Sequence, residues 1–362
     1  YMLYNCDDFI YNGHSLSEYG FMVVNFEEQE DLPLGMERTV EKSDKNRFRD
    51  RSHVFNVVSA SDLEFTISIM KNICDYPDTI DQAITEEELR EIAQWLTSND
   101  APLWLEKKKN GKVDDIQYLG LFTNITSFFL GELYGLTLSF SCVSPFGYTH
   151  TKTISKDVTG TVNFIVDNQT DVLNKYCYPV IKLRPKKNQD VLLVNQNDMS
   201  VLETGLLSFN DDTPSTEKLN LLKKKVDTYG TLHGLQIEYT YDDEEIQSYC
   251  DHSVLEFYGT DSNQKRKKYI AYYLNDNKAY TIGIGGYMCL KLSQSLNITI
   301  DCVKYKIYDS LKRPVYLSTL GVQDVDYFYW MQIKAGYNSM MYIGTDCQIT
   351  LEYQEPRKVG AF

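Results

Sequence analysis

The spacing of apolar and polar residues along the chain predicts a mainly β protein. Residues 63–69 and 134–142 alternate with a period of two, which is the pattern of a strand with one buried face. Further short strands are predicted through the second half of the chain, at 162–166, 179–183, 191–195, 297–301, 304–308, 328–333, 340–343 and 348–353. Many short strands at this spacing are typical of an antiparallel β-sandwich.

The first residues predict a β-hairpin. Two strand-like runs, Phe9–Tyr11 and Tyr19–Val24, lie on either side of Asn12-Gly13, a dipeptide that favours a type I′ turn. Residues 27–51 follow and are charged and irregular. That composition suits an exposed β-arm or loop between strands.

A helix is predicted after Thr85, because Thr85 and Glu88 have the spacing of a capping box. The residues that follow at i, i+3, i+4 and i+7 form one apolar stripe, with Trp95 on its flank: Leu89, Ile92, Ala93 and Leu96. We expect this stripe to pack against the sheet of the first domain. A second helix is predicted over 215–228.

A change of pattern near His150 predicts two domains. The segment 144–148, with its proline and glycine, ends the strand at 134–142. Residues 1–150 are therefore expected to form a β-rich domain with one helix, and residues 151–362 a β-sandwich. Between about 197 and 286 the strand spacing loosens, which predicts a segment inserted into the second domain.

The composition and charge of the chain argue against some classes of function. Thirty-six Lys and Arg against 51 Asp and Glu give a net charge of −15, which opposes binding to nucleic-acid phosphates. No apolar run approaches the roughly 18 residues of a membrane span. The first residues lack the basic and apolar regions of a signal peptide, so synthesis in a cytoplasm is expected.

Candidate chemistry is sparse. The eight cysteines have neither a C-x-x-C pair nor a histidine at metal-ligand spacing, so buried free thiols are expected. Catalytic and phosphate-binding motifs are missing from the sequence, and we expect neither an enzyme nor a cofactor or metal. The tryptophans, Trp95, Trp104 and Trp330, lie in periodic segments and are expected in cores.

Four segments, in their order along the chain, resemble the distal tail protein family of long-tailed, siphovirus-type bacteriophages and prophage tails. They are a strand with an Asn-Gly turn, a helix, a strand with a Pro-aromatic exit, and a C-terminal hairpin, at 9–21, 89–96, 136–148 and 334–353. The stretch from about 197 to 286 does not carry the family pattern. The resemblance therefore covers both ends of the chain.

The resemblance implies a structural role in the virion, at the phage tail tip, after assembly in the bacterial host cytoplasm. Members form a hexameric ring on the tail tube, made by the N-terminal domains, while galectin-like C-terminal sandwiches project outward. The implied partners are five further copies, the tail tube protein, the tail-tip protein and a baseplate or receptor-binding protein. Sequence-specific nucleic-acid binding and membrane insertion are not expected.

Three further expectations concern sites. Arg47, Arg49 and Arg51 form a basic end of the 27–51 segment, and we expect them to meet an acidic neighbouring subunit. A carbohydrate-binding module that contacts host-surface glycan is the alternative function, because exposed aromatic residues on a sandwich suit sugar rings. A glycosidase that uses the carboxylates at 242–245 is the third.

Overall fold

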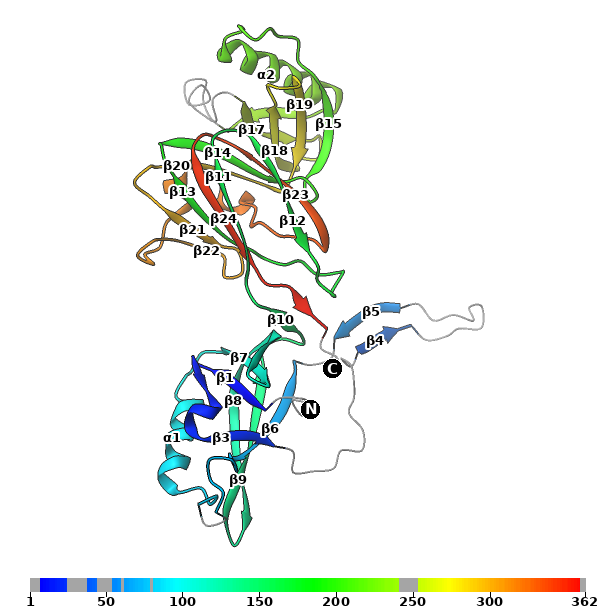
Figure 1. Ribbon diagram of the computed structural model, residues 1–362. Helices are drawn as coiled ribbons and strands as arrows, with labels where there is room; N and C mark the ends of the chain where they lie inside the picture. Colours follow the sequence, from blue (N-terminus) through cyan, green and yellow to red (C-terminus); the bar gives the residue numbers. More distant parts are fainter. Residues whose placement is uncertain are drawn as a thin grey trace. The chain divides into compact units, whose positions relative to one another are not determined.

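The computed structural model describes residues 7–24, 38–43, 54–59, 62–78, 81–240 and 253–358. These residues form antiparallel sheets and two α-helices, with turns and loops between them. Internal contacts divide the chain into two units, one of residues 1–150 with 355–362 and one of residues 151–354. Each unit is described by itself (Figure 1). The predicted mainly β fold class is confirmed.

One large sheet forms the N-terminal unit, with its strands in the order β2-β1-β7-β8-β9-β6-β3 and with β10 pairing with both β8 and β25. A separate pair, β4 (Arg38–Lys42) and β5 (Val54–Ser59), lies in the same part of the sequence. The strands of the large sheet are β1 Asp8–Tyr11, β2 His14–Ser15, β3 Phe21–Val24, β6 Glu64–Lys71, β7 Leu103–Lys109, β8 Lys112–Leu130, β9 Glu132–Cys142, β10 Gly147–Thr149 and β25 Pro356–Arg357.

The last strand belongs to the first unit, although the sequence placed residues 151–362 in one domain. Tyr148 of β10 pairs with Pro356 of β25, and the Thr149 N–H donates to the Glu355 carbonyl at 3.0 Å. The partner strand β10 lies more than two hundred residues earlier in the chain. The local pattern of residues 355–358 therefore could not predict this pairing.

The predicted N-terminal hairpin has the expected turn but a different partner strand. Asn12 and Gly13 have φ values of 51° and 77°, as a type I′ turn requires. However, β1 pairs with the two-residue β2, and β3 pairs with β6 instead. The Asp8 carboxylate accepts hydrogen bonds from the hydroxyls of Ser15 and Ser17 at 3.0 and 2.8 Å, which stabilises the 3-10 helix Leu16–Tyr19 between β2 and β3.

Helix α1 (Glu86–Thr97) begins with the predicted capping box at Thr85 and covers the sheet. Ile92 and Leu96 are buried, as the apolar stripe predicts. Trp95 is buried as well and does not lie on a flank. Its ring stacks between Phe9 and Tyr19, with ring centres 5.7 and 4.6 Å away.

Two sheets of the second unit face each other across a shared core, to which both contribute side chains such as Ile181 and Ile349 from one and Val191 and Met340 from the other. One sheet has the order β11-β24-β13-β21-β22 and the other β12-β23-β14-β20. The strands are β11 Lys152–Val158, β12 Val162–Asn168, β13 Val180–Pro185, β14 Gln189–Asn195, β20 Tyr287–Leu292, β21 Ile298–Asp301, β22 Lys306–Asp309, β23 Gly336–Ile343 and β24 Cys347–Tyr353. The two short 3-10 helices are η3 Leu317–Leu320 and η4 Val325–Tyr327.

One predicted strand of this unit is wrong. Residues 328–332 form a loop, and Ile333 makes an isolated bridge to Cys177. The apolar run predicted a strand because Met331 and Ile333 are indeed buried, but they reach the core from a loop.

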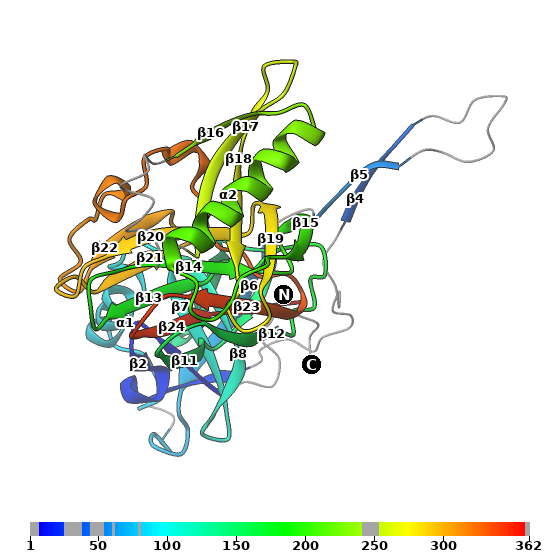
Figure 2. The same ribbon diagram turned by 90° about the horizontal axis from the view of Figure 1, so that it is seen from above.

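A third sheet with a helix lies in sequence between β14 and β20, which pair directly with each other. Its strand order is β15-β19-β18-β17-β16, and Figure 2 shows helix α2 (Ser215–Leu232) running along it. The strands are β15 Ser200–Leu206, β16 Gln236–Tyr239, β17 Val254–Thr260, β18 Arg266–Tyr273 and β19 Ala279–Ile284. We call residues 200–284 the insertion. Its core includes Leu192, Tyr287 and Met341 of the adjoining sandwich sheet, so the two share one apolar cluster.

Six of the eight cysteines lie in the described ranges, and all six are free thiols. Cys74 is exposed, whereas the other five are buried: Cys142, Cys177, Cys289, Cys302 and Cys347. The expectation of buried free thiols therefore fits five of these six positions. Neither described helix is long and apolar enough to cross a membrane.

Candidate docking surface and its polar support

The residues singled out as an interface in the sequence cannot be placed. Arg47, Arg49 and Arg51 lie outside the described residues, as do the carboxylates at 242–245. What is described nearby is the register of the flanking strands, in which Lys42 of β4 pairs with Val54 of β5.

Four aromatic side chains of the second unit lie together, and we call Tyr178, Tyr305, Phe328 and Trp330 the aromatic surface. The Tyr305 ring lies edge-on to Tyr178 and to Trp330, with ring centres 6.5 and 5.5 Å away. Phe328 meets Trp330 at 4.9 Å. Tyr305 is 57% exposed and Tyr178 37%, whereas Phe328 and Trp330 are half-buried. A cluster of this kind is a candidate for binding a partner.

The turn between β21 and β22 presents Tyr305. The Asp301 carboxylate accepts hydrogen bonds from the N–H groups of Val303 and Lys304, at 3.1 and 3.0 Å. Tyr305 then has a φ of 53°, in the left-handed region that a bulky side chain seldom adopts. The turn therefore holds an aromatic residue outward at a position where an unstrained residue would be glycine.

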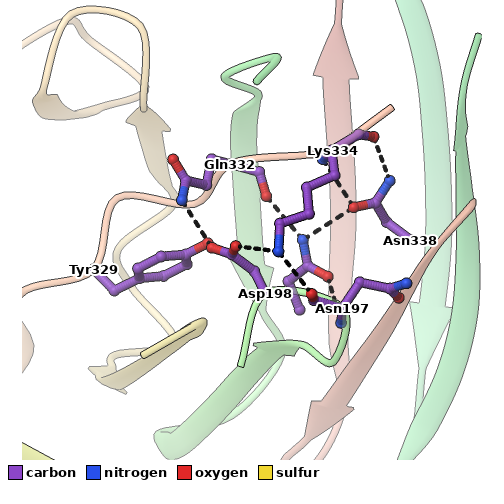
Figure 3. Close-up of polar contacts among 7 residues, drawn as sticks. Asn197, Asp198, Tyr329, Gln332, Lys334 and Asn338 are labelled. Carbon is purple, nitrogen blue, oxygen red and sulfur yellow. Dashed lines mark hydrogen bonds and ion pairs between the residues drawn. The ribbon is translucent and has the colours of Figure 1, made fainter. Parts of the chain in front are cut away.

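A cluster of polar side chains, drawn in Figure 3, includes residues on both sides of Trp330 in the sequence. We call it the Asp198 cluster: Asp198, Tyr329, Gln332 and Lys334. The Asp198 carboxylate accepts hydrogen bonds from the Tyr329 hydroxyl and from Gln332 Nε2, the latter at 2.9 Å, and it pairs with Lys334 Nζ at 3.1 Å. Tyr329 and Gln332 lie on either side of Trp330 in the sequence. The cluster thus fixes the loop that presents Trp330.

A second layer of amides supports the Asp198 cluster. Asn338 is fully buried, and its Oδ1 accepts from the Lys334 N–H at 3.0 Å and from Asn195 Nδ2 at 3.3 Å. Its Nδ2 donates to the Lys334 carbonyl at 2.8 Å. Lys334 Nζ also donates to the Asn197 carbonyl at 3.0 Å. These bonds fix the backbone and the side chain of Lys334 together.

The electrostatics of the cluster favour a positioning role. Burial raises the pKa of Asp198, but the hydrogen bonds from Tyr329, Gln332 and Lys334 outweigh it and hold the pKa below its usual 3.8. Burial and the Asp198 acceptor both raise the pKa of Tyr329. A carboxylate that three donors stabilise is a weak base, so the cluster orients the loop and is poorly suited to acid–base chemistry.

A second exposed apolar site occurs in the N-terminal unit, at the end of the long β8. Phe129 is 65% exposed and Phe128 40%, just before the turn at Gly131. The polar residues Thr123 and Thr126 occupy the exposed part of the same strand. An apolar tip on a polar hairpin is a second candidate contact for a partner.

Comparison with known proteins gives the class of the N-terminal unit. Residues 4–144 match the family model described as phage tail protein N-terminal domain. Residues 4–144 are therefore similar to a phage tail protein N-terminal domain. This match supports the predicted class, a protein of a phage tail and hence a virion component. No curated protein matches the chain.

Solved structures similar to this chain come from a phage hub and a phage baseplate. The Dit protein (gp 19.1) of phage SPP1, described as a hub of the adsorption apparatus, is 12% identical over 96% of this chain and 98% of its own, with a TM-score of 0.47. A chain of the phage P2 baseplate in its activated conformation with Ca is 6% identical over 96% of this chain and 97% of its own, with a TM-score of 0.40.

Proposed function

We propose that this protein is the structural hub of a phage tail tip, where it forms a hexameric ring that joins the tail tube to the tail-tip and receptor-binding apparatus. The observation that carries the proposal is the family match over residues 4–144, which coincides with the unit built on the large sheet. In this proposal that unit forms the ring, and the galectin-like sandwich projects outward to hold baseplate or receptor-binding proteins.

The division of the chain supports separate roles for the two units. Each has a core of its own, and the chain passes between them twice, near residues 150 and 355. The exposed aromatic surface belongs to the second unit, where a protein partner would bind. The exposed tip with Phe128 and Phe129 belongs to the first, where a neighbouring subunit or the tail tube would bind.

The basic segment gives a specific test of the ring interface. Arg47, Arg49 and Arg51 are proposed to meet an acidic surface on the neighbouring subunit, in a chain whose net charge is −15. Changing all three to Glu should weaken ring formation, more strongly at low salt, where exposed charges interact over longer distances. Undiminished assembly at low salt would remove this segment from the interface.

Co-expression tests the position of the hub between its partners. With an affinity tag on this chain, the tail tube protein and the tail-tip protein of the same phage should co-purify with it. A chain shortened to residues 151–354 should lose the tail tube protein. Retention of the tail tube protein by that fragment would contradict the assignment of the ring to the N-terminal unit.

Saccharide binding is the second candidate function, and the aromatic surface favours it, because aromatic rings suit the apolar faces of sugar rings. Isothermal titration with host cell-wall saccharide tests it. Saturable binding that Tyr305→Ala abolishes would support a carbohydrate-binding module. A hub without this activity shows no saturable binding at all.

A further inference from the structure

The loop of residues 321–334 contacts the insertion through what we call the first anchor. The Tyr258 hydroxyl, from β17, donates to Asp324 Oδ2 at 3.1 Å, and the Tyr327 hydroxyl donates to the Arg266 carbonyl of β18 at 3.2 Å. The rings of Tyr258 and Tyr327 also meet edge to face, 5.6 Å apart. Two residues of the loop are therefore bonded to two strands of the insertion.

Two other side chains of the insertion support Tyr258 in the first anchor. The Arg266 guanidinium lies 3.7 Å from the centre of the Tyr258 ring, and Arg266 Nη2 pairs with Glu238 Oε2 at 2.9 Å. Tyr258 is 5% exposed. The Tyr258 side chain is thus enclosed, and its hydroxyl faces Asp324.

The Asp198 cluster is the second anchor, because Asp198 lies where the chain leaves β14 for the insertion. The returning chain packs at the same point. The Asn195 N–H donates to the Gly286 carbonyl at 2.7 Å, and a Cβ on Gly286 would lie 2.5 Å from the Met199 nitrogen. The second anchor thus joins the loop to the place where both connecting segments run between the sandwich and the insertion.

Between the anchors lie the aromatic residues of the loop. Val322 and Met331 are buried in the sandwich core, and the segment from 323 to 330 connects them without strand pairing. Phe328 and Trp330 belong to this segment. The backbone hydrogen bonds of η4 are local to the segment. Its links to the rest of the unit are side-chain contacts, among them the two anchors and the aromatic surface.

We propose that residues 321–334 act as a strap through which the insertion holds the aromatic surface in one arrangement. With both anchors formed, the strap keeps Trp330 against Tyr305 and Phe328 against Trp330. Release of the first anchor frees the segment from 323 to 330 and so loosens this arrangement.

Hydrogen–deuterium exchange of the full chain tests the strap. Tyr258→Phe with Tyr327→Phe removes both hydroxyl donors of the first anchor and keeps both rings. We expect exchange in peptides covering 323–330 to rise roughly tenfold, from the loss of two hydrogen bonds. Peptides from β13 and β24 should be unchanged. Tyr316→Phe, which alters a 73% exposed tyrosine close to the strap, is the matched control and should change neither.

Unchanged exchange over 323–330 in the double variant overturns the proposal. Should the double variant also lose protection in β13 and β24, the single variant Tyr327→Phe decides, because Tyr327 is 39% exposed and its loss leaves the core intact. Faster exchange confined to the strap in that variant supports the proposal. Exchange equal to that of Tyr316→Phe refutes it.

Discussion

Glu88 performs two roles at the start of α1, and the variant Glu88→Gln separates them. Its Oε2 accepts hydrogen bonds from the N–H and the hydroxyl of Thr85, at 2.8 and 2.9 Å, which completes the capping box. Its Oε1 pairs with Lys71 Nζ at 2.8 Å. The Lys71 side chain, on β6, is 5% exposed. A glutamine keeps one oxygen that can accept from Thr85, but it leaves the Lys71 charge buried without its counter-ion.

The contacts of Lys71 set the size of the effect. Removing one partner of a fully buried ion pair costs about 3–5 kcal/mol. Glu88 is 27% exposed, and Lys71 keeps the Asp81 carbonyl at 3.0 Å and the Tyr76 ring at 4.8 Å. We therefore expect Glu88→Gln to lower the free energy of unfolding of the N-terminal unit by about 1–3 kcal/mol.

Urea unfolding in a Trp330→Phe background measures this loss, because the remaining Trp95 and Trp104 both lie in the N-terminal unit. Glu87→Gln is the control, since Glu87 is exposed in the same helical turn and should change stability by less than about 0.5 kcal/mol. In a Lys71→Met background, Glu88→Gln should cost less than about 1 kcal/mol. An equal cost in both backgrounds would refute the role of Lys71.

The pH dependence of this pair has a defined sign. Burial raises the pKa of Glu88, but Lys71 and Thr85 outweigh it, so the pKa lies below its usual 4.5. A lowered carboxylate pKa stabilises the fold above the usual value, and the stabilisation is lost as the pH falls below it. The difference between the native chain and Glu88→Gln should therefore shrink as the pH falls below 4.5.

Three further predictions follow from single side chains. Leu96→Asp places a carboxylate at a position that is 1% exposed and should abolish soluble expression or ring assembly; normal assembly would contradict its place in the core. In thiol labelling read by peptide mass, Cys74 should react in the native chain, and Cys142, whose pKa burial raises to about 12, only after unfolding; equal rates would oppose this. The hydrogen bond from Tyr329 to Asp198 should persist from about pH 4 to 10. The lowered pKa of Asp198 stabilises the fold above pH 3.8, and the raised pKa of Tyr329 stabilises it below pH 10.0. Loss of exchange protection over 321–334 within that pH range would contradict this prediction.

Features set by neighbouring residues could be predicted from the sequence. The capping box at Thr85 needs only residues three positions apart, and the Asn12-Gly13 turn needs only its own backbone preferences. The period-two pattern of 134–142 likewise matches β9. In each of these cases the structure depends on residues close together in the sequence, so the sequence pattern is enough to predict it.

Features that depend on distant partners could not be predicted. The second role of Glu88 requires Lys71 from another strand, and the Asp198 cluster joins residues more than a hundred positions apart. The run at 328–333 is apolar because part of it is buried, and burial alone does not distinguish a strand from a loop. The 28 tyrosines indicated interfaces but not which of them gather around Tyr305.

The hexameric ring is the central claim, and mass photometry of the purified full chain at near-physiological salt tests it most directly. We expect a species of six chains, at six times the 41.9 kDa of one chain, and the variant with Arg47, Arg49 and Arg51 changed to Glu should form less of it. Because some rings need a partner to close, the measurement is repeated with the tail-tip protein added. A single 41.9 kDa species in the first sample, and none with six copies of this chain in the second, would contradict the account.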